Sequence, residues 1–468
     1  MKYNPSAMLS LSLLHLERTV IAMSYSNQTP LQHLDSVISK TVSHIHDFTK
    51  SPTDFTRNRK LNAETTIKTI LNMQGNSLNA ELLDAFPDIN DRMTASAFEQ
   101  AKDKLQPDIF KHILNEYNQT DNPKLFNDKY RLLAIDGCDF TVPFNPNSVN
   151  VVPTSHGQDI CQIHANILYD IENRTYQDCL FQPKSASNER QAAIDMLKSF
   201  DTDDTPYIVT MDRGYSSFNM FETCNRLDNC FYVIRTKAGN TAINEIKNLP
   251  DKEIDTEMEF DITTSNHFYT QHRKDMPNLH CILHAKKRHK TSYSKNTIDV
   301  AWDFEQFCKI KVRVCKFKIS DDEYEVLITN LNRFEFPIEK MKELYHLRWD
   351  IETSFRELKY ALGGISFHSK KDDFIQMEIL AHLIMFNAVS RSISEVKVPK
   401  SNHKYEYAID FKMACLLIRK YFNKYCVTPY KQLYAEILSY INPVRPDRAD
   451  KRKAIKIKQA LWFVYRVA

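Results

Sequence analysis

The sequence predicts a mixed α/β fold in which a sheet-forming middle lies between helical regions at both ends of the chain. Residues 28–125 carry apolar side chains at the period of a helix. Residues 126–240 contain three successive strand-like segments and then alternate between helix and strand, and residues 241–335 return to strands. The chain has 468 residues, enough for two or three domains. The other expected regions are 1–27, a poorly defined start; 336–395, the second part of the α/β core; and 396–468, a helical and basic C-terminal region.

The N-terminal region is expected to be a set of short helices. The segments AETTIKTILNM, NAELLDAF and TASAFEQAKDKL each carry apolar residues three or four positions apart. Asn, Ser and Thr stand where helix N-caps would lie. Short helices joined by tight turns are compatible with a DNA-binding module, and equally with other small helical domains.

In the middle of the chain, two buried strands carry acidic residues. YRLLAIDGCDFTV places Asp136 on the first strand, and TPYIVTMDRGY places Asp212 at the end of the fourth. Between them lie two strands around the turn IENR and the helix ASNERQAAIDMLKSF, with Ser or Asn at its cap. The helix FNMFETCNRL and the strand CFYVIRTKA follow. The predicted order β-β-β-α-β-α-β describes a mixed sheet flanked by helices.

Residues 241–335 are expected to form a β-rich insertion. EIDTEMEFDITT, LHCILHAKKRHK, FCKIKVRVCKFKI and EYEVLITNL are strand-like, and several of them alternate. The alternation is strict in KIKVRV and slips at Cys315–Lys316, which predicts a β-bulge there. After the insertion, DDFIQMEILAHLIMFNAVSRSI is predicted to be a long helix of the core.

The segment YHLRWDIETSFRELKYALGG, residues 345–364, places four polar residues on one face of a predicted helix. At ~100° per residue, Tyr345, Arg348, Glu352 and Lys359 lie within roughly a sixth of the circumference. Leu347, Ile351, Phe355, Leu358 and Leu362 form the neighbouring apolar stripe, and Gly363–Gly364 is a natural helix stop. An ordinary surface helix with an Arg–Glu pair would show the same pattern.

Composition sets limits on the classes of protein. Charged residues are 26% and hydrophobic residues 42% of the chain, as in ordinary soluble proteins. The net charge is only +3, so nucleic-acid binding would need local basic patches. The ten cysteines contain no C-x-x-C pair and suit a reducing cytosol. No apolar run approaches the roughly 20 residues of a membrane span. MLSLSLLHLERTVIAM weakly resembles a signal segment but lacks a cleavage site, and Met23 is an alternative start.

Three carboxylates stand out as a candidate catalytic set. If the sheet and the later helix pack as an ordinary α/β layer, Asp136, Asp212 and Glu352 converge at one edge. Clustered carboxylates need a cation, and oxygen-only ligands favour Mg²⁺ or Mn²⁺ over zinc. A pair of such ions suits phosphodiester chemistry, and Arg348 and Lys359 on the same face would hold phosphates.

Asp139 is the alternative to Asp136 as a ligand, because it lies three residues further along the same strand. Strand alternation places it on the opposite face, so we favour Asp136. His156 and His164 are not expected to be ligands.

These motifs resemble a known family. The pattern Tyr-x2-Arg-x3-Glu-x6-Lys is similar to the signature helix of the insertion-sequence-four family of bacterial DDE transposases. AIDGCD resembles the first-Asp motif of that family, VTMDRGY its second, and FHSKKDDFIQMEI the stretch after the signature helix. The resemblance runs from about residue 125 to 395.

The resemblance implies a ribonuclease-H-like catalytic domain interrupted by a β-rich insertion. By position, Asp136, Asp212 and Glu352 would be the catalytic, metal-binding triad, with two Mg²⁺ or Mn²⁺ ions in each site. Tyr345, Arg348 and Lys359 would contact the transposon-end phosphates. Lys370, in the stretch after the helix, is a further candidate for DNA contact. The implied partners are double-stranded DNA at terminal inverted repeats and at the target, held by a homodimer in the bacterial cytoplasm.

Two further residues are DNA-binding candidates. Relatives that form a DNA hairpin carry an aromatic residue 21 positions before the signature Tyr, which here is Tyr324. It would stack on a flipped base, or simply pack on the sheet. Arg213 would bind phosphate or pair with a local acid. The basic runs at 286–290 and 450–458 would contact the DNA backbone or form solvated faces.

Two other functions remain open on the sequence. One is a DNA-binding relative that keeps the fold without transposing, and the other is a stand-alone ribonuclease-H-like DNA nuclease. The intact set of acids favours an active transposase over the first, and the long insertion favours it over the second.

Overall fold

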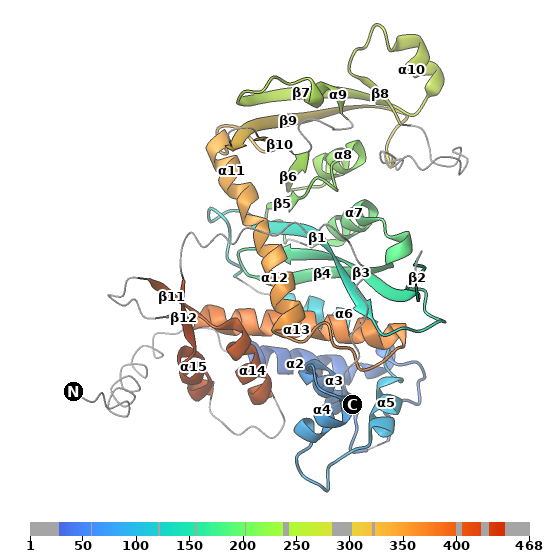
Figure 1. Cartoon of the computed structure of the whole chain (residues 1–468), viewed down its shortest axis with the longest axis vertical. Helices are drawn as coiled ribbons and strands as arrows, with labels where there is room; N and C mark the ends of the chain where they lie inside the picture. The colour runs from blue at the N-terminus through green and yellow to red at the C-terminus, as the bar shows by residue number, and fades with distance from the viewer. Residues whose placement is uncertain are drawn as a thin grey trace, which may run out of the picture.

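A large mixed sheet runs through the middle of the molecule, with helices on its faces and at the ends (Figure 1). This computed structural model describes residues 28–57, 59–119, 122–154, 157–201, 203–236, 243–282, 302–320, 323–398, 405–422 and 430–444. The predicted mixed α/β fold class is confirmed. No helix in these ranges is both long and apolar enough to cross a membrane. Outside them lie the start at 1–27, the basic runs at 286–290 and 450–458, and His156.

Five strands form the first half of the sheet in the predicted order. They are β1 (Arg131–Val142), β3 (Ile160–Asp170), β4 (Thr175–Pro183), β5 (Tyr207–Met211) and β6 (Cys230–Thr236). Two helices, α7 (Glu189–Ser199) and α8 (Phe218–Arg226), connect the last three. The order across the sheet is β4-β3-β1-β5-β6, with β1 antiparallel to β3 and parallel to β5. This order and these directions are those of a ribonuclease-H-like fold.

The strands of the β-rich stretch extend the same sheet. They are β7 (Ile254–Thr263), β8 (Leu279–Cys281), β9 (Phe307–Ser320) and β10 (Glu323–Thr329), with the short helices α9 (Asn244–Lys247) and α10 (Asn266–His272). Strand β10 pairs antiparallel with β6, and β9, β7 and β8 follow outward. On the opposite edge, β2 (Val151–Val152) pairs with β3. The stretch between β6 and the later helices therefore lengthens the sheet.

The bulge predicted at Cys315–Lys316 is wrong. Cys315 pairs with Asp255 on one side and with Leu327 on the other, and the register of β9 with β7 is unbroken there. The register of β9 with β10 shifts only between Glu323 and Tyr324. The alternation slips because side chains on both faces of β9 are buried in this part of the strand.

Short helices with polar caps form the N-terminal part, as predicted. They are α2 (Pro30–Ser43), α3 (Ala63–Asn72), α4 (Leu78–Ala85), α5 (Ala95–Lys102) and α6 (Asp108–Asn118), with the 3-10 turn η1 (Ile45–Phe48). The side chains of Asn62, Ser77 and Thr94 each accept a hydrogen bond from a backbone N–H in the first turn of α3, α4 and α5. These bonds satisfy donors that have no partner inside the helix.

Three consecutive helices follow β10: α11 (Ile338–Leu347), α12 (Trp349–Tyr360) and α13 (Asp372–Glu395). The predicted signature helix is therefore interrupted at Arg348, which is the C-cap of α11 and the N-cap of α12. The expected stop is present, because Gly363 has a φ of +76° and the N–H of Gly364 donates to the carbonyl of Leu358. Such a positive φ favours glycine.

Side chains from alternate positions of β1 enter two different cores. Ala134 and Cys138 belong to the core that also contains α12 and α13, which we name the α13 core. Leu133 and Ile135 belong to the core formed with α7 and α8. This alternation decides which side chains of β1 can face α12.

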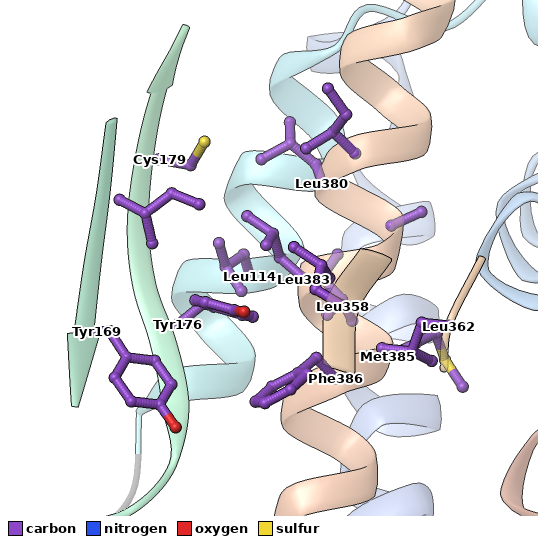
Figure 2. Packing of buried hydrophobic residues seen from close by; sticks show 14 of the residues in the cluster. Leu114, Tyr169, Tyr176, Cys179, Leu358, Leu362, Leu380, Leu383, Met385 and Phe386 are labelled. Carbon is purple, nitrogen blue, oxygen red and sulfur yellow. The ribbon is translucent and has the colours of Figure 1, made fainter. Parts of the chain in front are cut away.

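Helix α13 is buried along most of its length, which confirms its prediction as a core helix. Figure 2 shows its residues Leu380, Leu383 and Phe386 on the side of α13 that is turned to helix α6 and strand β4. The rings of Phe386 and Tyr176 lie 4.7 Å apart between centroids. The N-terminal helices and the sheet thus share one hydrophobic core.

The C-terminal part contains two helices and a small sheet. The helices are α14 (Phe411–Phe422) and α15 (Tyr430–Leu438), and the strands are β11 (Glu406–Ile409) and β12 (Ile441–Val444). The strands pair antiparallel with each other. The sequence indicated the helices but not this two-stranded sheet.

A buried ion pair links the N-terminal helices to α13. The ammonium of Lys102 lies 2.6 Å from the carboxylate of Glu378, and both side chains are fully buried. The second carboxylate oxygen of Glu378 accepts hydrogen bonds from the backbone and the ring of His368. Burial raises the pKa of Glu378, but Lys102 and His368 outweigh it and lower this pKa to about 2.

We expect Lys102→Met to destabilise the fold by about 3–5 kcal/mol at pH 7, because it leaves the Glu378 charge buried without its cation. In the wild type the stabilisation from Glu378 is present above the unfolded pKa of about 4.3 and is lost as pH falls towards 2. The loss in the variant should therefore shrink as pH falls and Glu378 takes up a proton. Urea unfolding at several pH values measures both effects.

Two controls accompany this measurement. Lys40→Met breaks the exposed Lys40–Glu116 pair and should cost less than about 1 kcal/mol. The double variant Lys102→Met/Glu378→Leu should regain much of the lost stability. Equal losses in Lys40→Met and Lys102→Met would contradict the prediction.

Candidate active site

Asp136 lies on the face of β1 that is turned to α12. It stands between Ala134 and Cys138 on the same side of the strand, and both of these belong to the α13 core. One oxygen of its carboxylate accepts a hydrogen bond of 2.8 Å from the N–H of Gly137. A Cβ at position 137 would lie 2.5 Å from the ring of His164, so only glycine fits there without a shift of that ring.

Asp212 follows directly after β5, the strand that pairs parallel with β1. Its Oδ1 accepts a hydrogen bond of 2.7 Å from the N–H of Gly214, which fixes the carboxylate over the tight turn. Ile135 and Met211 are the last residues that pair between these parallel strands, so Asp136 and Asp212, which follow them, lie next to each other.

Helix α12 brings the third acid, Glu352, and Arg348 bridges it to the sheet. One terminal nitrogen of Arg348 lies 2.9 Å from Oε1 of Glu352, and the other lies 3.5 Å from Oδ2 of Asp136. The guanidinium is almost fully buried, with its side chain 5% exposed. Arg348 reaches both acids from the junction between α11 and α12.

The acids repel one another in this setting. Burial is the largest cause that raises the pKa of Asp136, to about 6; the charges of Asp212 and Glu352 add to it, and Arg348 and the N–H of Gly137 oppose it. Such a site favours binding of a cation. In this structure the cation is the guanidinium of Arg348.

The three carboxylates fit a hard divalent cation by chemistry, because all their donors are oxygen. No three His, Cys, Asp or Glu side chains within the described ranges are arranged to hold one metal ion as they stand. Asp136, Asp212 and Glu352 are the residues that would hold such an ion, and the guanidinium of Arg348 lies between two of them.

The other two residues of the signature pattern also turn towards β1 and the site. The ammonium of Lys359 donates to the carbonyl of Asp139 at 2.9 Å. The ring of Tyr345 lies 5.7 Å from the guanidinium carbon of Arg348, and burial raises the pKa of its phenol to about 12. The Tyr345 hydroxyl is buried and has no hydrogen-bond partner within the described chain. The predicted shared face is thus present despite the break at Arg348.

Asp139 points to the opposite face of β1, as the alternation predicted. His164 and Lys184 hold its carboxylate, the latter at 2.9 Å. The ring of His164 also lies 3.1 Å from the carboxylate of Glu189. Burial opposes protonation of His164, but Asp139 and Glu189 raise its pKa to about 9, so it is a cation at neutral pH. The Asp139 cluster is therefore neutralised by groups of the chain itself.

The remaining predicted residues lie on three other segments of the chain. Arg213 is exposed beside Asp212. Lys370 is exposed before α13, and its carbonyl accepts a hydrogen bond from Asn145. Tyr324 lies on β10, where its hydroxyl donates to the carbonyl of Asp251 and its ring lies 5.1 Å from the ammonium of Lys316.

Tyr215 is a site residue that the sequence reasoning did not single out. Its side chain is fully buried, and its hydroxyl has no hydrogen-bond partner in the described part of the chain. Burial raises the pKa of Tyr215 most, and the charges of Asp136, Glu189 and Asp212 raise it further. The phenol therefore lies among the acids. Its place in the motif VTMDRGY, three residues after Asp212, was the available signal.

We expect Tyr215→Phe to leave the free energy of unfolding unchanged or to raise it by up to about 1 kcal/mol, because a buried hydroxyl without a partner is unfavourable. Tyr176→Phe is the matched control, because the buried hydroxyl of Tyr176 donates to Ser354 at 3.0 Å. The control should lose about 1 kcal/mol. Denaturant unfolding of both variants measures the difference, and equal losses would show that Tyr215 has a partner.

Comparison with known proteins identifies the family. The family model described as "Transposase DDE domain" matches residues 127–388, which include Asp136, Asp212 and Glu352. Among solved structures, the piggyBac transposase synaptic complex with hairpin DNA aligns over 91% of this chain and 88% of that chain, with 11% sequence identity and a TM-score of 0.44. No curated protein matches the sequence. Because the family model covers more than half of the chain, the chain belongs to the DDE transposase family.

Proposed function

We propose that the chain is an active transposase of the insertion-sequence-four type, which cuts DNA at the ends of a mobile element and joins those ends to a target. The observation that carries the proposal is the convergence of Asp136, Asp212 and Glu352 at one edge of the sheet, with Arg348 between two of them. The full signature, Tyr345, Arg348, Glu352 and Lys359, lies on this side of α11 and α12.

Two Mg²⁺ or Mn²⁺ ions are the proposed cofactors, held by the three acids. When bound, such a pair activates the attacking oxygen and stabilises the leaving oxygen of a phosphodiester. Arg348 would leave Asp136 and Glu352 at that point, and its guanidinium would be free to grip two oxygens of a phosphate. The same side chain thus neutralises the acids before the ions arrive and binds the substrate afterwards.

The proposed reaction has two steps at phosphorus. In the first, a water oxygen bonds to phosphorus, the bond to the 3′ oxygen breaks, and that oxygen gains a proton, which leaves a 3′-OH and a 5′-phosphate. In the second, the 3′-OH loses its proton as its oxygen bonds to a phosphorus of another strand, the bond from that phosphorus to its own 3′ oxygen breaks, and the displaced oxygen gains a proton. Lys359 and Tyr345 would hold the phosphates in line. Tyr215 would donate a hydrogen bond from its buried position next to the acids.

The proposed substrates are the terminal inverted repeats of the element and a target duplex, in the cytoplasm of a bacterium. Two copies of the chain would each hold one end in a synaptic complex. The exposed Arg213 and Lys370 would contact DNA backbone outside the acid cluster. The N-terminal helices, which share the α13 core with the sheet, are the proposed reader of the end sequence.

We expect Glu352→Gln to reduce Mg²⁺-dependent cutting of the gene's own flanking ends on the order of 100-fold or more, because the substitution removes a charged ligand. Glu343→Gln, an exposed position on α11, is the matched control and should cut like the wild type. Chelation of divalent ions should abolish cutting, and Mn²⁺ should restore it. Binding of the ends without any cutting in all three proteins would instead favour a DNA-binding relative. Cutting of any branched or plain duplex without preference for the ends would favour a nuclease.

A hairpin intermediate is also proposed, with Tyr324 as the stacking residue. Ile328 of β10 pairs with Ile234 of β6, which in turn pairs with Met211 of β5. The part of β10 before Ile328 therefore extends beyond the end of β5, on the edge where Asp212 lies. Tyr324 stands on this overhang, half-buried and next to Lys316.

We expect Tyr324→Ala to lose hairpin product while first-strand nicking continues, because only the ring that stacks on the flipped base is removed. Tyr324→Phe is the control: it loses the hydrogen bond to Asp251 but keeps the ring, and it should form hairpins. The products are separated on denaturing gels. Unchanged hairpin yield in Tyr324→Ala would end the stacking role.

A further inference from the structure

A groove lies at the far end of α12, next to the C-terminal small sheet. It has a volume of about 410 Å³ and is formed by the last turns of α12, the start of α14 and the strands β11 and β12. Arg356 and Tyr360 line it from α12, Lys412 from α14 and Asn442 from β12. Tyr360 is 68% exposed, so its ring is accessible to a partner at the groove.

The acids that line the groove have hydrogen-bond or ion-pair partners, whereas its two bases have none among the described residues. Glu357 forms an ion pair of 2.7 Å with Arg174. Asp410 accepts hydrogen bonds from the N–H of Met413 and from the side chain of Asn442. Arg356 and Lys412 are exposed and make no hydrogen bond or ion pair with the described residues. With Glu357 paired to Arg174, the groove offers two cations, Arg356 and Lys412, against one carboxylate, Asp410, whose partners are neutral.

The groove continues the catalytic face of α12. Glu352, Arg356 and Tyr360 are spaced four residues apart, so they follow one another along the same side of the helix. Eight residues of helix span ~12 Å at ~1.5 Å per residue. In duplex DNA this length corresponds to roughly three to four base pairs at ~3.4 Å each. A strand that reaches Glu352 can thus run along α12 into the groove.

We propose that this groove binds the backbone of the DNA, roughly three to four base pairs from the bond that is cut. Arg356 and Lys412 contact phosphates, and Tyr360 packs against a sugar or a base. The inference rests on the proposed function, since it assigns a second contact region for the same DNA. In this proposal the DNA contacts a surface of the C-terminal part as well as the residues of α12.

The test compares end duplexes that extend ten base pairs beyond the cut on both sides with duplexes trimmed to two base pairs on one side or the other. Arg356→Gln/Lys412→Gln should bind the long duplex about 10-fold more weakly, and the slope of log affinity against log salt should fall by about two. It should bind one of the trimmed duplexes as the wild type does. Tyr360→Ala should weaken binding of the long duplex in the same direction.

The matched control is Lys247→Gln/Lys431→Gln, which removes two exposed charges away from the groove and should retain wild-type binding. Thermal unfolding checks that every variant keeps the fold. The proposed groove contact would be contradicted if the groove and control variants lost the same affinity. It would also be contradicted if the groove variant lost the same affinity for the long duplex and for both trimmed duplexes. Failure of the wild type to bind or cut any end duplex would instead reject the proposed function.

Discussion

The contact of Arg348 with Asp136 and Glu352 is the interaction on which the site depends. It joins a helix junction to a strand 212 positions earlier in the chain. Burial and the neighbouring acids raise the pKa of Asp136, so the cluster needs a positive charge nearby. Arginine remains charged at every physiological pH and can face two carboxylates at once. Its position therefore offsets the charge of the two acids that it contacts.

The sheet supplies rigidity around this contact. Strand β1 lies between β3 and β5, and both of its faces are covered by packed cores. Asp136 and Asp212 are thus fixed by paired strands and by hydrogen bonds from the N–H groups of Gly137 and Gly214. Arg348 differs, because it lies where α11 ends and α12 begins. The acids are held on rigid elements while their counter-charge is held at a junction.

Helix α13 connects this site to the remainder of the molecule. It packs on β4 and α6 in one core, and Glu378 ties it to Lys102 of the N-terminal helices. His368, in the loop after α12, joins the same buried network. The loop that carries Lys370 is thereby positioned by the N-terminal part as well as by the sheet. The N-terminal helices and the acid site are thus fixed relative to one another through α13.

Much of the fold and part of the site could be predicted from local patterns. Strand alternation separated Asp136 from Asp139, and the structure places the latter with His164 and Lys184 on the other face. Helix period placed Tyr345, Arg348, Glu352 and Lys359 on one side. The helix N-caps at Asn62, Ser77 and Thr94 could be predicted from the type of one residue at each helix start. The slip at Cys315 was misread, because burial of both faces of β9 erases alternation just as a bulge does.

Local patterns in the sequence predict the order of the main strands and helices, but not the small sheet of β11 and β12, and they place the three acids in separate motifs. These patterns repeat every two or 3.6 residues, so a short window contains them. The packing of distant segments settles three further points: β10 continues the sheet from β6, Arg348 bridges two acids, and the Tyr215 hydroxyl lies near the acids without a hydrogen-bond partner among the described residues. Each of these depends on segments far apart in the chain being packed together, and no local period encodes which distant segments will meet.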